Sequence, residues 1–208
     1  MMMDESQEMN EPEVAKVKVV LVGEANVGKT SIVSRFKNKT FNENYNFTVG
    51  IDFYSKLVRT AKHSVKLQIW DTAGQERFRS LLPSYLRDCA VVLMVYDITN
   101  KKSFDGLDFW VNYVKQRAKL TVLVIIVGTK LDLNASRKIE RKTAEEYCAK
   151  FGYAYYEVSA KTGENMEKLF ARAAEHAKSE ETKSRIDDTT IHVDLGNRRE
   201  KRQSRCNC

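Results

Sequence analysis

The chain is 208 residues long, carries a formal net charge of +7 and has 42% hydrophobic and 30% charged side chains. This is the composition of a soluble globular protein, and the length suits one α/β domain of ordinary size with tails. No apolar run reaches the length that a membrane-spanning helix needs.

The charge and the cysteines indicate possible partners and a compartment. Residues 198–205 hold five basic side chains and one acidic side chain, a local charge of +4. Such a tail favours an anionic membrane surface over nucleic acid as its partner, and a merely solvated tail is the alternative. Cys89 and Cys148 are isolated and Cys206 and Cys208 form a terminal pair, so no spacing suggests a disulfide framework or a zinc site. A reducing, cytosolic compartment is expected.

We expect three parts along the chain. Residues 1–15 begin with an acidic stretch without the apolar core of a secretory leader, and we interpret them as a disordered extension. Residues 16–178 are expected to form the folded domain, and residues 179–208 a flexible tail.

The first element is a strand at residues 17–22, followed by Gly23–Thr30 and a helix over residues 31–36. Gly23–Thr30 reads G-E-A-N-V-G-K-T and matches the phosphate-binding pattern G-x-x-x-x-G-K-[ST] in its required strand-to-helix context. Its glycines let successive backbone N–H groups point at phosphate oxygens, and the helix N-terminus adds a positive dipole end. Lys29 would reach the terminal phosphates and Thr30 would bind Mg²⁺. The alternative is a glycine-rich turn that binds nothing.

Two strands are expected next, at residues 51–59 and 64–71, after a polar, loop-like stretch at residues 37–50. In the second strand apolar and polar residues alternate, and this period of two places Trp70 on the polar face. A large aromatic side chain at such a position is typical of an anchor for a partner protein, and cover by a helix is the competing explanation.

The remaining elements alternate between strands and helices. Residues 89–96 and 121–127 are nearly continuous apolar runs, as in central parallel strands. Two N-terminal capping signals predict helices, one over 103–119 with Ser103 as N-cap and one opened by Thr143 and Glu146 and ending near Phe151. A short strand at 154–158 precedes a last helix with apolar residues at helical spacing: Met166, Leu169, Phe170, Ala173 and Ala177. We predict a doubly wound, six-stranded, mostly parallel α/β sheet with helices on both faces and ligands at the carboxyl ends of its strands.

Three further loops at strand ends carry chemistry. In Asp71–Glu76, Asp71 can hold Mg²⁺, the Gly74 N–H can approach a terminal phosphate and Gln75 can orient an attacking water. In Gly128–Asp132, the carboxylate of Asp132 can accept from the ring N–H and the exocyclic amine of guanine, a donor pair that adenine lacks. In Ser159–Lys161, the Ala160 N–H could meet the guanine carbonyl. Taken singly, each of the last two loops is equally compatible with a guanine-binding role and with an ordinary βα loop.

The motifs GEANVGKT, DTAGQE, TKLD and SAK, with the single Thr48, resemble the Ras superfamily of small GTPases over residues 16–178. Within it, Tyr45–Phe53 and Trp70–Phe78 are similar to the Rab family, and residues 81–88 and 96–100 to its Golgi-associated subgroup. The motifs and the resemblance together give the expected GTP-binding residues: Gly23, Glu24, Ala25, Asn26, Val27, Gly28, Lys29, Thr30, Ser31, Phe41, Tyr45, Thr48, Gly74, Thr129, Lys130, Asp132, Ser159, Ala160 and Lys161.

The resemblance also implies how the site would work. Phe41 would stack on the guanine face, Tyr45 would close over the phosphates, and Thr48 would join Thr30 and Asp71 around Mg²⁺ when the γ-phosphate is present. The γ-phosphate would order two loops, residues 42–50 and 72–80, and hydrolysis would release them. Effector proteins would read this change through an exposed aromatic trio: Phe53, Trp70 and Tyr85.

Two residues depart from the family pattern. Thr129 stands where most relatives have Asn, as in Rho-type relatives, so guanine selectivity is expected to survive with one base contact weakened. Ala25 stands where several relatives have Gly, close to the γ-phosphate, and its side chain can crowd Gln75 and slow intrinsic hydrolysis.

The tail ends in Cys206-Asn207-Cys208, a C-x-C terminus that in Rab proteins receives two geranylgeranyl groups; two exposed thiols are the alternative. Two chains and the basic stretch before them would anchor the protein stably to anionic membrane. Ile191, Val193 and Leu195 resemble the apolar element with which Rab proteins engage their escort protein and dissociation inhibitor.

The sequence therefore predicts a monomeric Rab-type GTPase that cycles between cytosol and intracellular membranes, with Golgi membranes favoured. It would bind GTP or GDP with Mg²⁺ and work with effectors, an exchange factor and a GTPase-activating protein. Gln75 would orient the attacking water. The alternative function is that of a GTP-loaded scaffold, which would hydrolyse GTP too slowly to act as a switch. An ATP-dependent P-loop kinase is disfavoured by Asp132 and by the lack of a second substrate-binding insert.

Overall fold

The fold is seen in a computed structural model that describes residues 14–42, 50–60, 64–72 and 80–176. Six strands form one sheet in the order β2-β3-β1-β4-β5-β6. Their bounds are β1 Ala15–Val22, β2 Ile51–Arg59, β3 Ser64–Thr72, β4 Val91–Asp97, β5 Leu123–Thr129 and β6 Ala154–Glu157. All neighbouring pairs are parallel except β2 with β3. The predicted six-stranded, mostly parallel sheet is confirmed.

Burial follows position in the sheet. Every residue of the central strand β4 is buried, as its continuous apolar run predicts. In β3 buried and more exposed positions alternate up to Trp70, which shares its face with Lys66 and Gln68. The predicted period of two is therefore confirmed, and Trp70 is partly buried because residues of α2 (Leu82–Leu86) pack beside it.

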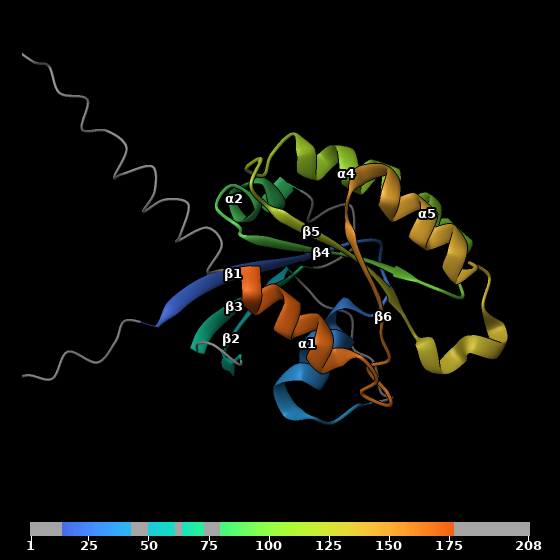
Figure 1. Cartoon of the computed structure of the whole chain (residues 1–208), viewed down its shortest axis with the longest axis horizontal. Coiled ribbons are helices and arrows are strands. Elements are labelled where there is room, and N and C mark those ends of the chain that lie inside the picture. The colour runs from blue at the N-terminus through green and yellow to red at the C-terminus, as the bar shows by residue number, and fades with distance from the viewer. Residues whose placement is uncertain (1–13, 43–49, 61–63, 73–79, 177–208) are drawn as a thin grey trace, which may run out of the picture.

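Helices cover both faces of the sheet (Figure 1). On one face α1 (Lys29–Asn38) and a C-terminal helix over residues 166–176 pack on the sheet, with Phe36 and Phe170 in contact. On the other face lie α2, α4 (Leu107–Lys115) and α5 (Arg141–Phe151), around the fully buried Trp110. The 3₁₀ helix η2 (Leu131–Ser136) connects β5 to α5.

Two capping predictions are wrong. Ser103 is not an N-cap, because the helix begins earlier, as α3 (Lys101–Asp105), with the Asn100 side chain accepting from the Lys102 N–H. Ser103 is instead buried and its hydroxyl bonds to the backbone of Asp97 and Asn100. Thr143 lies inside α5, which starts at Arg141 after Glu140 without a side-chain cap.

The other boundaries agree to within a few residues. The predicted helix over 103–119 is divided into α3 and α4 and ends at Lys115. In the part of the chain that the structure describes, no helix combines the length and the apolar character needed to cross a membrane.

Because β1, β3, β4, β5 and β6 run in the same direction, the loops at their carboxyl ends meet at one edge of the sheet. These loops carry most of the predicted nucleotide-binding residues.

Candidate functional site

The loop after β1 has the shape of an anion-binding nest. Gly23 (φ 143°), Asn26 (φ 63°) and Gly28 (φ 94°) all have positive φ, which turns the backbone N–H groups inward, and α1 begins directly afterwards at Lys29. The tight turn and the helix N-terminus thus come together at the end of a buried strand. This geometry suits a phosphate group.

The side chain of Lys29, the first residue of α1, folds back into this loop. Its ammonium is buried and donates to the carbonyl oxygens of Gly23 at 2.9 Å and Glu24 at 2.7 Å. Burial lowers the pKa of Lys29 to about 8, against the opposing influence of Asp71 and Glu24. A phosphate placed in the loop would supply the negative charge that this buried ammonium needs.

Asp71 at the end of β3 provides the test of whether the residues fit Mg²⁺. Its carboxylate is buried, and neither oxygen has a hydrogen-bond partner among the residues that the structure describes. Burial raises the pKa of Asp71 to about 6, although the nearby Thr30 hydroxyl and the Lys29 ammonium act in the opposite direction. A buried carboxylate that lacks a hydrogen bond of standard geometry and lies beside a hydroxyl fits a cation that is shared with phosphate oxygens. The described segments hold no cluster of three or more acidic, His or Cys side chains that could bind a metal by itself.

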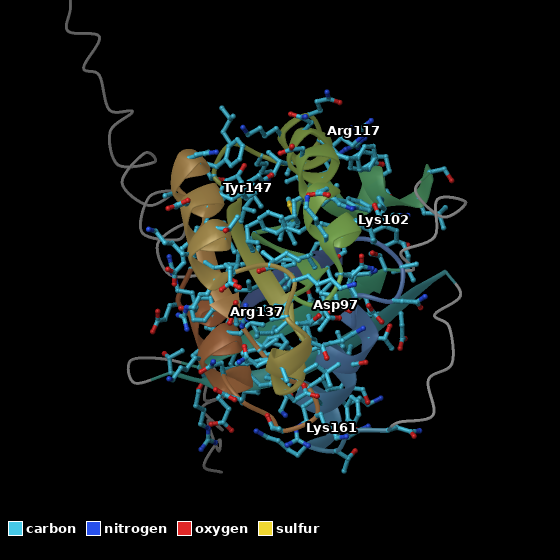
Figure 2. The ribbon with its side chains drawn as sticks, turned by 90° about the vertical axis from the view of Figure 1, so that its right-hand side faces the viewer. Asp97, Lys102, Arg117, Arg137, Tyr147 and Lys161 are labelled. Atoms are coloured by element: carbon cyan, nitrogen blue, oxygen red, sulfur yellow. The ribbon has the colours of Figure 1, made fainter. Side chains whose placement is uncertain are left out.

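A pocket of about 270 Å³ adjoins the loop. It brings together eight of the predicted nucleotide-binding residues with two further apolar ones. The lining residues are Gly28, Ser31, Ile32, Phe41, Thr129, Lys130, Asp132, Leu133, Ala160 and Lys161. They come from the end of the phosphate loop, from α1 and the stretch after it, from the end of β5 and the segment that follows, and from the segment after β6. Figure 2 shows Lys161, from the last of these segments, at one end of the molecule. The size and apolar character of the pocket suit a planar base.

Asp132 is held in place by Ser159. The Ser159 hydroxyl is buried and donates to Asp132 Oδ1 at 2.6 Å, and Ser159 is absent from the pocket lining. Ser159 thus orients the carboxylate, which leaves its other oxygen and lone pairs to the pocket.

Lys130 is oriented in a comparable way by a residue that sequence reasoning missed. Its ammonium forms an ion pair with the buried Asp97 at 2.6 Å, and Lys130 itself has the left-handed φ of 62°. The other oxygen of Asp97 accepts from the Thr99 N–H and hydroxyl. Asp97 (Figure 2) ends a strand at the site edge of the sheet, and that position was the signal that could have found it.

Thr129 connects the phosphate loop to the sheet. Its side chain is buried, with the hydroxyl oxygen 2.5 Å from the Val27 carbonyl oxygen and 3.0 Å from that of Tyr96. A hydroxyl has one proton, so it donates to one of these carbonyls at a time. The structure thus gives Thr129 a contact with the loop backbone, which sequence reasoning did not anticipate.

The predicted effector residues form a continuous aromatic strip. The ring centroids of Phe53 and Trp70 are 4.7 Å apart and those of Trp70 and Tyr85 are 4.8 Å apart. Phe53 is exposed, and the Lys18 ammonium lies 5.7 Å from the ring centroids of both Trp70 and Tyr85. The strip spans β2, β3 and α2, and none of its three residues lines the pocket.

Several predicted residues lie outside the described part of the chain. They are Tyr45, Thr48, Gly74, Gln75, Cys206 and Cys208, together with most of the two loops expected to switch and the whole tail.

The fold and the site define a P-loop nucleotide-binding protein. The features that define it are the loop with its two glycines, the lysine and helix that follow, the buried carboxylate and the base-sized pocket. The model of the Ras family matches residues 18–179, and the chain belongs to the Ras family. It is therefore a small GTPase, a molecular switch that binds GTP and GDP and hydrolyses GTP. GTPases of this family typically use Mg²⁺ and act with regulators and effectors.

Proposed function

We propose that the chain is a Rab-type small GTPase that regulates intracellular vesicle trafficking, with Golgi membranes as its site of action. The observation that carries this proposal is the strip of Phe53, Trp70 and Tyr85, whose rings are in contact across three elements. Aromatic side chains grouped on a surface are typical of binding hot spots. Along the sequence Phe53 follows residues 42–50, and Trp70 and Tyr85 flank residues 72–80, the two loops that the γ-phosphate would order. A partner bound at the strip could therefore distinguish GTP from GDP.

In this proposal each part of the site has a defined task. Lys29 and the backbone N–H groups of the phosphate loop bind the phosphates, and Asp132 with the Ala160 N–H selects guanine. Thr30 and Asp71 would hold Mg²⁺, with Thr48 joining them in the GTP state. Bound Mg²⁺ neutralises negative charge on the β- and γ-phosphates. Gln75 orients the attacking water, and a GTPase-activating protein accelerates an intrinsically slow reaction.

The addition of two geranylgeranyl groups to a C-x-C end distinguishes a Rab protein from members of the family that carry one prenyl group on a C-a-a-X end. The full chain, incubated with Rab escort protein, Rab geranylgeranyl transferase and geranylgeranyl diphosphate, is expected to gain two geranylgeranyl groups by mass spectrometry. The Cys206→Ser and Cys208→Ser variants should each gain one, and the double variant none. Modification only by an enzyme specific for C-a-a-X ends, or no modification, would contradict the Rab assignment.

The rival function is a GTP-loaded scaffold, and Ala25 is the residue that favours it. Single-turnover hydrolysis of bound GTP by the wild type and by Gln75→Leu separates the two. For a switch we expect slow hydrolysis by the wild type and a rate lower by roughly tenfold or more in the variant, because positioning of the water is lost. Equal rates in both, with or without Ala25→Gly, would favour the scaffold.

A further inference from the structure

The segment that carries Asp132 is not held by apolar burial. None of the six residues of η2 is buried, and Leu133 at its centre has non-helical angles of φ −93° and ψ 29°. Short 3₁₀ helices have poor hydrogen-bond geometry and little stability of their own. The position of Asp132 must therefore be fixed by polar contacts at the two ends of η2.

The start of η2 is tied directly to the segment after β6. The Leu131 N–H donates to the Val158 carbonyl at 3.1 Å, and the Ser159 hydroxyl holds the Asp132 carboxylate. These bonds place Asp132 relative to residues 159–161, the other part of the proposed guanine site. They fix one end of η2 only.

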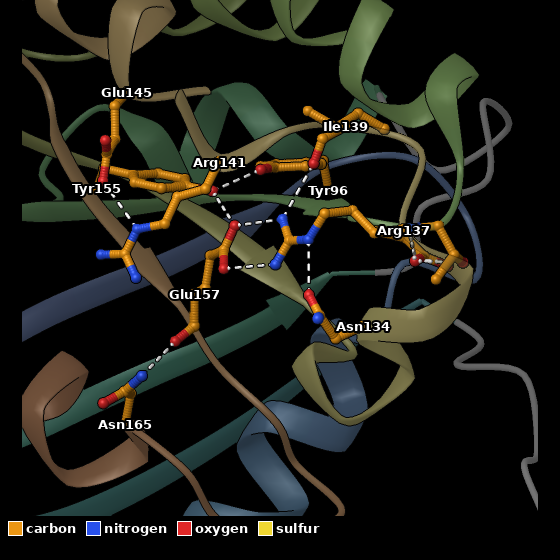
Figure 3. Close-up of polar contacts among 11 residues, drawn as sticks. Tyr96, Asn134, Arg137, Ile139, Arg141, Glu145, Tyr155, Glu157 and Asn165 are labelled. Carbon is orange, nitrogen blue, oxygen red and sulfur yellow. Dashed lines mark hydrogen bonds and ion pairs between the residues drawn. The ribbon is translucent and has the colours of Figure 1, made fainter. Parts of the chain in front are cut away.

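The far end of η2 is held by Arg137, which follows its last residue. The guanidinium forms two parallel hydrogen bonds to the carboxylate of Glu157, Nη1 to Oε1 at 2.7 Å and Nη2 to Oε2 at 2.8 Å (Figure 3). Its Nε donates to Asn134 Oδ1 within η2 at 2.8 Å, and Nη1 also donates to the Ile139 carbonyl. One planar side chain thus joins the end of η2 to β6.

Glu157 connects Arg137 to the segment that carries residues 159–161, the other part of the proposed guanine site. It ends β6, and its carbonyl accepts from the Asn165 side chain at 2.8 Å, across the turn formed by residues 158–165. The Tyr155 hydroxyl donates to its Oε1 at 2.7 Å and lies 2.7 Å from the Tyr96 hydroxyl on β4. The Glu157 and Arg137 side chains are only 2% and 12% exposed, so the pair is shielded from solvent.

We propose that the Glu157–Arg137 pair is a positioning element for base selectivity, holding Asp132 at the distance from residues 159–161 that guanine requires. The inference rests on the proposed role of Asp132 as the acceptor of the guanine amine. Neither residue of the pair lines the pocket, so both act through Asp132. A purely structural pair would affect the stability of the fold and leave base selectivity unchanged.

The test compares the affinities for GDP and IDP by competition against a fluorescent GDP analogue on the full chain. Hypoxanthine lacks the exocyclic amine of guanine, so the ratio of the two affinities measures the amine contact alone. Asp132→Ala gives the ratio without that contact. The test variant is Arg137→Met/Glu157→Gln, because a neutral pair of similar size replaces a buried ion pair without leaving an unpaired charge. The matched control is Arg141→Met/Glu145→Gln, the same substitutions in an exposed pair on α5.

In the wild type we expect a preference for GDP of roughly tenfold to a hundredfold, the effect of one hydrogen bond to a charged group. The Arg137→Met/Glu157→Gln variant should lose most of this preference, with a ratio at least roughly fivefold lower than in the wild type and a folded state by circular dichroism. The control should keep the wild-type ratio. Arg137→Lys, which keeps the charge but not the paired hydrogen bonds, should fall between them.

The outcomes separate the inference from the proposed site. A wild type without preference for GDP means that Asp132 does not contact the amine, and both ideas fail. A preference that Asp132→Ala abolishes but that the folded Arg137→Met/Glu157→Gln and Arg137→Lys variants keep would overturn the positioning role alone. A lower ratio in the control as well would mean that any change near α5 disturbs the site, which also contradicts a specific role for the pair.

Discussion

Gly23→Ala is expected to lower the free energy of unfolding by about 3 kcal/mol, through overpacking and backbone strain together. Gly23 has φ 143°, a conformation that side chains rarely adopt, and a Cβ there would lie far inside the contact distance of the Val95 carbonyl oxygen on β4. Neither obstacle is a flexible side chain, so the backbone of β1 or β4 would have to move. Urea unfolding of the nucleotide-free protein measures the change.

Gly152→Ala is the matched control for Gly23→Ala. Gly152 also has a positive φ, of 68°, but no atom from elsewhere in the fold lies within 4 Å of the position of its Cβ. Only the backbone strain remains, so we expect a loss of about 1 kcal/mol. Equal losses at both glycines would mean that the close approach to β4 is unimportant and that Gly23 is needed for phosphate binding alone.

The single substitution Arg137→Met is expected to destabilise the fold by about 3–5 kcal/mol at neutral pH, because it leaves the buried carboxylate of Glu157 without its cation. The exposed pair of Lys101 and Asp105 provides the comparison. Lys101→Met should cost about 0.5 kcal/mol or less, since exposed pairs contribute little. If Arg137→Met were no worse than Lys101→Met, the buried pair would not contribute to stability.

The pH dependence of unfolding gives an independent check on the same pair. Burial alone would raise the pKa of Glu157, but the hydrogen bonds from Arg137 and Tyr155 and the charge of Arg137 outweigh it and hold the pKa below its ordinary value of 4.5. A depressed pKa of an acid stabilises the fold above the unfolded value, and this stabilisation is lost as the pH falls through the folded value. The wild type should therefore lose more stability than the Arg137→Met/Glu157→Gln variant between pH 5 and pH 3.

In the Arg137→Met variant the pKa of Glu157 is expected to shift in the opposite direction. Without the guanidinium, burial raises the pKa of Glu157, so the carboxylate takes up a proton more readily in the folded chain than in the unfolded one. The deficit in stability relative to the wild type is then largest at neutral pH and decreases as the solution is acidified. A deficit that stays constant from pH 7 to pH 4 would show that lost packing, and not charge, causes the effect.

Patterns within short stretches of sequence predicted most of the fold. The order of strands and helices follows from apolar runs and periods that each segment carries in itself, and β2 was predicted with the bounds that the structure shows. The edge at which the site lies followed as well, because parallel strands bring their carboxyl ends together. The capping prediction at Ser103 failed because a local motif competes with tertiary contacts, and the Ser103 hydroxyl bonds to the end of β4 instead. The prediction at Thr143 failed because α5 begins two residues earlier, at Arg141.

The sequence by itself determined the nature of the protein, since the phosphate loop is one contiguous motif whose spacing already specifies its chemistry. Only the tertiary structure revealed how that motif and the neighbouring segment that carries Asp132 are supported. Thr129 meets Val27 across 102 positions of the chain, and Arg137 meets Glu157 across 20. Such pairs leave no periodic signal in the sequence, because their partners become neighbours only when strands and loops from distant parts of the chain pack together.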